Sequence, residues 1–154
     1  MSETEASETT LRLERLIAAS PEILFALWID PAQLVKWWAP DGYQASVHAL
    51  ETKPGGRWRV SLHGPDGGTP SMSGVYRIVE PPHRLAFTWA WDGEGDARGH
   101  ESEVTVNFEK VPGGTRLVLV HERFEGRPAR DRHNNGWTAA LDHLTKIAAE
   151  AAGR

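Results

Sequence analysis

The side chains with the most chemical potential in this chain are seven histidines and seven tryptophans, and no cysteine accompanies them. The histidines lie mostly on separate segments and form neither a His-x-x-x-His pattern nor an acid-bearing ligand pattern, so no metal is assigned. A Gly-x-Ser-x-Gly nucleophile motif and a phosphate-binding glycine loop are also missing from the sequence. The pattern therefore assigns no catalytic residue and no cofactor.

His121 is the histidine that is most strongly predicted to be internal. It follows Leu117 and Leu119 at alternate positions of a strand pattern, so its imidazole takes the place of an aliphatic side chain. A buried imidazole needs a hydrogen-bond partner, which is either a neighbouring group of the protein or a bound ligand. Acid–base chemistry at His121 or at a carboxylate in the same cavity is a third interpretation. Tyr76 is similar, because its ring can fill core while its hydroxyl reaches a cavity.

The tryptophans stand at positions 28, 37, 38, 58, 89, 91 and 137. Tryptophan is large and amphipathic, so an inward-facing indole either fills core or lines a binding cavity. Trp89 and Trp91 end a strand pattern beside a glycine-rich segment, which favours the second role for this pair. The predicted ligand-binding residues are Trp37, Trp38, Tyr76, Trp89, Trp91, His121 and Trp137.

A single long helix, predicted over residues 130–151, must position these groups. Its apolar residues recur every three or four positions, at Trp137, Leu141, Leu144, Ala148 and Ala151. Upstream of it, turns rich in Gly and Pro separate strand patterns at residues 43–52, 56–63, 71–80, 84–91, 101–110 and 115–122. A curved sheet that grips the helix is the arrangement that covers its apolar face.

Alternation within the strands predicts which side chains face the helix. The inward set is Trp58, Val60, Leu62, Tyr76, Ile78, Leu85, Phe87, Trp89, Trp91, Val104, Val106, Phe108, Leu117, Leu119 and His121. The outward set includes Arg57, Arg59, Arg77 and Thr88.

The N-terminal part begins with a polar tail over residues 1–8, which is expected to be disordered, and a strand over residues 11–17. Ser20-Pro21 and Asp30-Pro31 each combine an N-cap residue with a proline in the first turn, so short helices are predicted at 20–29 and 31–38. The expected fold is α+β: a curved seven-stranded antiparallel sheet wrapped around a long C-terminal helix, with two short helices between the first two strands. It forms a single domain over residues 9–152.

Several short motifs also occur in a characteristic order. They are Trp37-Trp38, Gly55-Gly56 before an Arg-Trp strand, Pro65-Asp66-Gly67, the run from Pro82 to Trp89, the Gly-Thr-Arg-Leu segment that leads from Gly114 to His121, and Gly136-Trp137. Together, over roughly residues 9–152, they resemble the activator of heat-shock-protein-90 ATPase homologue family of the START-like (SRPBCC) superfamily. The resemblance implies a helix-grip fold with a hydrophobic cavity between sheet and helix.

The composition narrows the classes of function. The net charge of -4, from 17 basic and 21 acidic residues, argues against general nucleic-acid binding, which requires a clustered basic surface. No apolar run approaches the length of a membrane span, and residues 1–10 do not resemble a signal peptide. The absence of cysteine is compatible with a reducing compartment, so a cytoplasmic location without membrane association is expected.

Three functions remain open, and the first is preferred. It is the non-catalytic binding, carriage or sensing of a small hydrophobic or aromatic molecule in the cavity. The second is a chaperone-accessory or self-associating interaction module, which requires an exposed apolar patch. The third is a cyclase-type or hydrolase-type enzyme that uses the same cavity. The basic cluster Arg123, Arg127, Arg130 and Arg132 either recruits an anionic ligand at the cavity mouth or is a solvated loop balanced by Glu122, Glu125 and Asp131.

Overall fold

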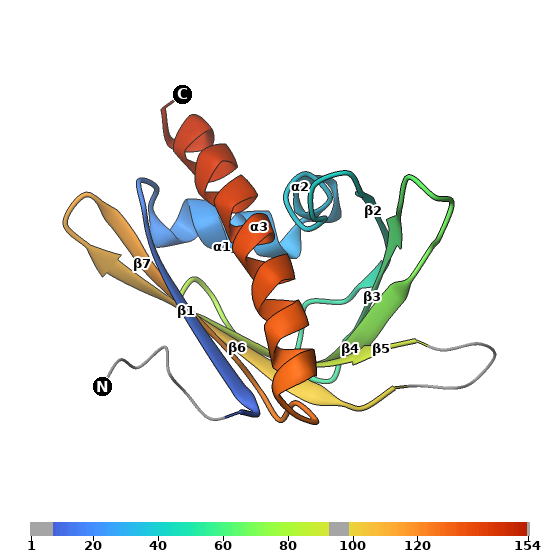
Figure 1. Cartoon of the computed structure of the whole chain (residues 1–154). Coiled ribbons are helices and arrows are strands. Elements are labelled where there is room, and N and C mark those ends of the chain that lie inside the picture. Colours follow the sequence, from blue (N-terminus) through green and yellow to red (C-terminus); the bar gives the residue numbers. More distant parts are fainter. Residues whose placement is uncertain (1–7, 93–98, 154) are drawn as a thin grey trace.

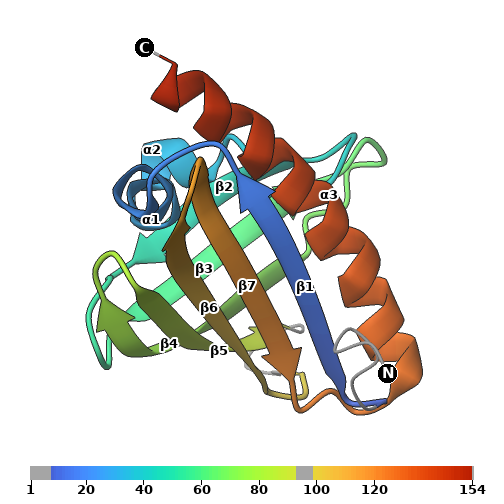
Figure 2. The same cartoon turned by 90° about the vertical axis from the view of Figure 1, so that its left-hand side faces the viewer.

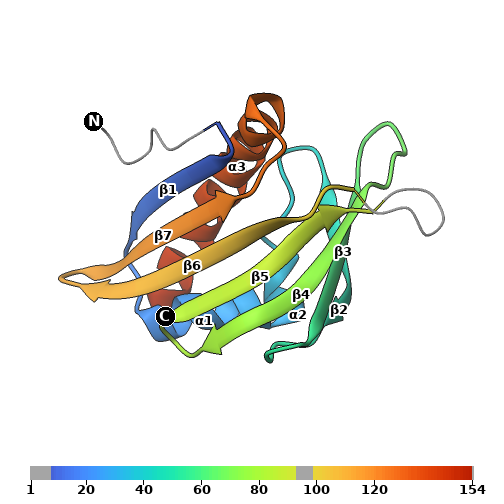
Figure 3. The ribbon, with the colours of Figure 1, turned by 90° about the horizontal axis from the view of Figure 1, so that it is seen from below.

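The computed structural model describes residues 8–92 and 99–153, in which a long helix crosses the concave face of a seven-stranded antiparallel sheet (Figure 1). In chain order the elements are β1 (Thr10–Ile17), α1 (Pro21–Ile29), α2 (Pro31–Leu34), β2 (Gln44–Leu50), β3 (Arg57–His63), β4 (Ser71–Glu80), β5 (Arg84–Trp91), β6 (Ser102–Val111), β7 (Gly114–Glu122) and α3 (Arg127–Ala152). The spatial order of the strands is β1-β7-β6-β5-β4-β3-β2, so the first strand pairs with the last (Figure 3). The predicted helix-grip fold is confirmed.

The short helices begin where the sequence predicts, but α2 is shorter than expected. Ser20 caps α1, because its hydroxyl accepts a hydrogen bond from the backbone N–H of Ile23. The α-helical part of α2 ends at Leu34 rather than Trp38, and turns carry the chain on to Trp38. Consecutive residues of a helix point in different directions, whereas both indoles of the Trp37-Trp38 pair are buried here. The turns allow both rings to enter the core.

The long helix α3 begins three residues earlier than predicted, at Arg127. Gly126 precedes it without a side-chain cap, so the sequence lacks the usual start signal. Pro128 lies in the first turn, where the missing N–H of proline has no helical partner to lose. The predicted apolar face is confirmed at its centre, because Trp137, Leu141 and Leu144 are all buried.

The sheet has the predicted faces along most of its length. The core residues Leu85, Phe87, Val104, Val106, Leu117 and Leu119 are each at most 3% exposed, while Arg57, Arg59 and Arg77 are exposed, as predicted. The prediction for Thr88 is wrong, because this residue is only 3% exposed. Its Oγ1 accepts a hydrogen bond of 2.8 Å from the backbone N–H of Val75, so the side chain replaces a ladder acceptor between β4 and β5.

Ile78 is the second residue whose predicted face is wrong. A register shift between Tyr76 and Ile78 places Ile78 opposite Ala86, while Val79 pairs with the inward-facing Leu85. A one-residue irregularity of this kind moves the following side chains to the opposite face of the sheet. Val79 therefore packs against the core in place of Ile78.

The edge strand β2 also contains an irregularity. Its register against β3 shifts between Val47 and Ala49, which leaves His48 as the extra residue. The imidazole Nε2 of His48 lies 2.7 Å from Ser61 Oγ, and Ser46 Oγ lies 2.8 Å from His63 Nε2. Side chains as well as backbone groups thus join β2 to the rest of the sheet.

Two sequence predictions fall on parts of the chain that the structure does not describe. Residues 1–7 of the predicted tail and residues 93–98 of the glycine-rich segment lie outside the described residues. Glu8, the last residue of that tail, is described, and its carboxylate accepts a hydrogen bond of 2.7 Å from Arg127.

The C-terminal half of α3 is covered by a second element besides the sheet. The helix α1 lies beside its C-terminal half, and β1 runs next to it at the edge of the sheet (Figures 1 and 2). In this region Leu24, Phe25, Phe108, Leu144 and Ala148 are all buried. The ring centroids of Phe25 and Phe108 are 5.5 Å apart, so the α1 side of the core is closely packed.

Candidate functional site: a tryptophan-lined pocket

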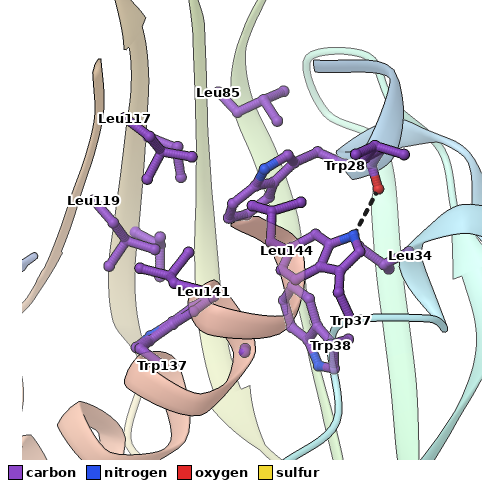
Figure 4. Packing of buried hydrophobic residues seen from close by; sticks show 14 of the residues in the cluster. Trp28, Leu34, Trp37, Trp38, Leu85, Leu117, Leu119, Trp137, Leu141 and Leu144 are labelled. Atoms are coloured by element: carbon purple, nitrogen blue, oxygen red, sulfur yellow. Dashed lines mark hydrogen bonds between the residues drawn. The ribbon is translucent and has the colours of Figure 1, made fainter. Parts of the chain in front are cut away.

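Six buried indoles fill the centre of the space between α3 and the sheet. They are Trp28, Trp37, Trp38, Trp58, Trp89 and Trp137, each at most 8% exposed, and four of them are labelled in Figure 4. The ring centroids of Trp28 and Trp37 are 4.6 Å apart, and those of Trp38 and Trp89 are 5.5 Å apart. Such ring contacts stabilise a core beyond the area that they bury. These indoles therefore occupy much of the space between sheet and helix in which the sequence predicted a cavity.

An open pocket remains where this cluster ends, beside the N-terminal half of α3. Its volume is about 310 Å³, and its wall comes from α3, from β3, β4 and β5, and from the loop before β2. The lining residues are Trp38, Pro40, Tyr43, Leu62, Pro70, Met72, Trp89, Trp91, Arg132, His133, Gly136, Trp137 and Ala140. Four of the seven predicted site residues are among them: Trp38, Trp89, Trp91 and Trp137.

Trp91 differs from the other predicted inward residues because it lies at the rim. It is 41% exposed, and its indole Nε1 donates a hydrogen bond of 3.2 Å to His133 Nε2. The ring centroids of Trp91 and Trp89 are 6.0 Å apart in an edge-to-face arrangement. The end of β5 thus delivers one buried and one accessible indole to the pocket.

The structure does not bring Trp37 and Tyr76 to this pocket. Trp37 is fully buried, and its Nε1 donates a hydrogen bond of 3.0 Å to the backbone oxygen of Leu27, drawn as the dashed line in Figure 4. Tyr76 packs its ring against Phe87 at 5.7 Å, further along β4 than the pocket. Burial raises the pKa of the Tyr76 hydroxyl well above its ordinary value, and a hydrogen bond with Thr52 opposes this effect.

His121 is internal, as expected, but its two ring nitrogens already have partners within the protein. Trp137 Nε1 donates to His121 Nδ1 at 3.0 Å, so the proton of the neutral ring must be on Nε2, which lies 2.7 Å from Ser102 Oγ. The Ser102 hydroxyl in turn donates to the backbone oxygen of Trp89. Burial and then the neighbouring His133 lower the pKa of His121 well below 6.5. His121 is not among the residues that line the pocket, and both of its ring nitrogens contact protein groups.

His133 is the pocket residue that the sequence interpretation missed. It is partly buried against Trp89, with ring centroids 5.4 Å apart, and it lines the pocket. Burial, and to a smaller extent the charge of Arg132, lowers the pKa of His133 to about 4, so the ring is neutral near pH 7. One signal was available: His133 stands four residues before Trp137 and so continues the apolar face of the helix by one turn.

The four arginines of the predicted basic cluster have different surroundings. Arg127 contacts Glu8 at 2.7 Å, and Arg130 contacts Asp131 at 3.0 Å. Arg132 is exposed, lines the pocket, and forms no ion pair within residues 8–92 and 99–153. It is the cluster member that faces the candidate site.

The lining of the pocket carries few reactive side chains, and His133 is the one titratable imidazole among them. The lining residues include no carboxylate, thiol or serine that could act as a nucleophile or as a general base. In the part of the chain that is described, no group of three or more acidic or histidine side chains is placed to hold a metal ion. Nor does any helix there have the length and apolar character needed to cross a membrane.

The family model for the Activator of Hsp90 ATPase homolog 1-like proteins matches residues 18–149. The chain belongs to this family. The AHSA1 protein of Silicibacter pomeroyi shares 36% sequence identity with it at a TM-score of 0.82, and the match covers 92% of this chain and 99% of the other. A protein of Rhodobacter sphaeroides shares 31% identity at a TM-score of 0.82, with 96% of each chain covered.

Other members of the fold are more distant in sequence. A protein of Chromobacterium violaceum matches at a TM-score of 0.84 with 24% identity, over 92% of this chain and 98% of its own, which shows a shared fold. A comparison with curated protein sequences gives no match. Membership of the AHSA1-like family supports a ligand-binding or accessory domain in general, and the particular activity must be argued from the site.

Proposed function

We propose that this AHSA1-like protein binds a small, mostly apolar aromatic molecule in the pocket beside the N-terminal half of α3, as a carrier or sensor that does not convert it. The observation that carries the proposal is the wall of four indoles, from Trp38, Trp89, Trp91 and Trp137, around an open volume of about 310 Å³. Flat aromatic walls favour a ligand that contains a ring, because ring contacts add to the free energy of burial.

The size of the pocket limits the ligand. A volume of about 310 Å³ lies at the lower end of the range for small-molecule sites, roughly 300–1,000 Å³. A compact molecule with one or two rings fits such a space.

The distribution of exposed apolar groups supports the same site. Four large hydrophobic side chains are exposed among the described residues: Leu16, Tyr43, Val75 and Trp91. Two of them, Tyr43 at 39% and Trp91 at 41%, lie together at the rim of the pocket. Exposed aromatic groups that border a concave surface are typical of binding sites.

Gly136 provides a third line of support. A glycine in a helix interior destabilises the helix by about 1 kcal/mol relative to alanine. Nothing in the fold requires a glycine here, because a Cβ at this position would meet no atom within 4 Å. The space beside Gly136 belongs to the pocket, so the residue keeps the site open at the expense of helix stability.

The test uses 2-naphthamide as a neutral aromatic probe and isothermal titration calorimetry as the measurement. Wild-type protein should bind the probe, and Gly136→Leu should abolish binding by filling the pocket. Gly136→Ala is the matched control, which should raise the free energy of unfolding by up to about 1 kcal/mol and keep most of the affinity. Equal affinity in wild type and in a folded Gly136→Leu protein would exclude the pocket as the site.

The chaperone-accessory and enzymatic alternatives have less support. Leu16 and Val75, the exposed apolar residues outside the pocket, are on β1 and β4, which three other strands separate. They do not form one patch for a protein partner. An enzyme would require a reactive group in the wall, and the lining residues supply none beyond the neutral His133. The cytoplasmic location remains a prediction.

A further inference from the structure

We infer that the ligand of this pocket is an aromatic carboxylate, whose ring lies among the indoles and whose acidic group pairs with Arg132 at the mouth. The inference rests on the proposed function and narrows its ligand class. It depends on the balance of hydrogen-bond donors and acceptors in the wall.

The lining side chains offer donors in excess. Arg132 carries five N–H donors and no acceptor, and an indole is a donor only. Among the lining indoles, Trp89 Nε1 is buried and has no hydrogen-bond partner among the described residues. An unpaired donor of this kind favours a ligand that brings acceptor oxygens.

Acceptors in the wall are few. His133 Nε2 is already occupied, because it accepts the hydrogen bond from Trp91 Nε1. The neutral His133 ring therefore carries its proton on Nδ1, which is one more donor without a partner among the described residues. The hydroxyl of Tyr43 is the other oxygen or nitrogen acceptor among the lining side chains, and it can also donate.

The net charge of the pocket wall also favours an anionic ligand. Among the described lining residues Arg132 is the one charged group, and no Asp or Glu accompanies it. Asp131, its neighbour in sequence, is engaged by Arg130 at 3.0 Å. One guanidinium matches one monovalent anion, and arginine binds a carboxylate through two parallel hydrogen bonds.

The buried indoles and the exposed Arg132 together favour an amphipathic ligand with a fixed orientation. Trp137 and Trp89 are nearly fully buried in the wall, whereas Arg132 is exposed. The ring of the ligand can thus leave water while its carboxylate stays in contact with solvent. This contact limits the desolvation penalty of the charge.

The experiment compares 2-naphthoate with the neutral 2-naphthamide, which has nearly the same shape. Calorimetry on the wild-type protein should show the carboxylate binding about tenfold or more tightly than the amide. Raising sodium chloride should weaken 2-naphthoate and leave 2-naphthamide unchanged, because salt screens the pairing at the exposed mouth.

Two variants separate a local contact from the general charge of the protein. Arg132→Gln should reduce 2-naphthoate affinity about tenfold or more and leave 2-naphthamide affinity within about twofold. Arg127→Gln removes the same charge from the same helix at a position outside the pocket, so it should change neither affinity by more than about twofold.

The outcomes distinguish this inference from the function on which it rests. If the amide binds as tightly as the carboxylate, or if Arg132→Gln weakens both probes equally, the anion is excluded while the pocket remains a binding site. If neither probe binds to the wild-type protein, the proposed function itself fails for ligands of this kind, and the inference fails with it.

Discussion

The space between α3 and the sheet has two ends, which the same chain fills in different ways. At the α1 end, Phe25, Phe108, Leu144 and Ala148 are all buried, and the rings of Phe25 and Phe108 are in contact. At the other end, residues of α3, β3, β4 and β5 line an open pocket of about 310 Å³. Both ends use large aromatic groups, so aromatic content alone does not distinguish core from site. The difference is whether a neighbouring element, here α1, supplies a second layer of side chains.

Two histidines differ in the same way, one in the packed core and one at the open pocket. His121 is fully buried with both nitrogens paired, whereas His133 is partly buried and has one nitrogen engaged by the accessible Trp91. Burial lowers the pKa of both rings. A shifted pKa in this protein therefore marks burial and does not by itself identify the site.

The largest expected effect comes from removing one indole at the boundary of the two ends. Trp137 is 4% exposed and donates to His121, so Trp137→Ala should lower the free energy of unfolding by about 3–5 kcal/mol. Trp91→Ala should cost less than about 1 kcal/mol, because Trp91 is already 41% exposed. Urea unfolding of both variants measures the difference. Equal losses would mean that the open end is packed as firmly as the closed one.

The next largest effect is the loss of folding stability at acidic pH. The pKa of His133 is about 4 in the folded protein against 6.5 ordinarily, so between these values the unfolded chain binds more protons. Stability should therefore fall as the pH drops from about 6.5 towards 4, with His133 contributing about 2–3 kcal/mol of the loss at pH 4.5. His121 acts in the same direction, because burial lowers its pKa as well.

The matched comparison for this effect is His133→Gln. Urea unfolding at pH 7.5 and at pH 4.5 should show a smaller loss in this variant than in wild type, because the replaced group no longer takes up a proton on unfolding. An identical loss in both proteins would mean that His133 is better solvated than the structure indicates.

The smallest of the three effects tests the division of roles. His121→Phe leaves the Trp137 indole N–H without its acceptor in a buried position, which should cost about 1–3 kcal/mol. Probe affinity should remain within about twofold, because His121 does not line the pocket. Weaker binding without a loss of stability would support the original expectation that His121 contacts the ligand.

Local patterns predicted most of the framework but not the way its parts meet. The bounds of β4 and β5 follow from alternation and flanking turns, and the caps of α1 and α2 follow from Ser20 and Asp30. The irregularity beside Ile78 has no such local signal, because it depends on pairing with β5.

The site was predictable in part. Trp89, Trp91 and Trp137 reach the pocket because they stand in register with core positions. The partners of His121 were not predictable, because Ser102 and Trp137 are 19 and 16 residues away in sequence. Which end stays open depends on the summed volumes of side chains from several elements, and no periodicity encodes that sum.

The irregularity at His48 has a consequence for solubility. An open sheet exposes unpaired backbone groups along its edge strands, and a second copy of the chain can extend the sheet there. In β2 the extra residue between Val47 and Ala49 breaks the even spacing of those groups and bends the strand. The bonds from Ser46 and His48 to β3 keep that bend in place. The strand is thus a poorer template for edge-to-edge pairing than a regular edge strand would be.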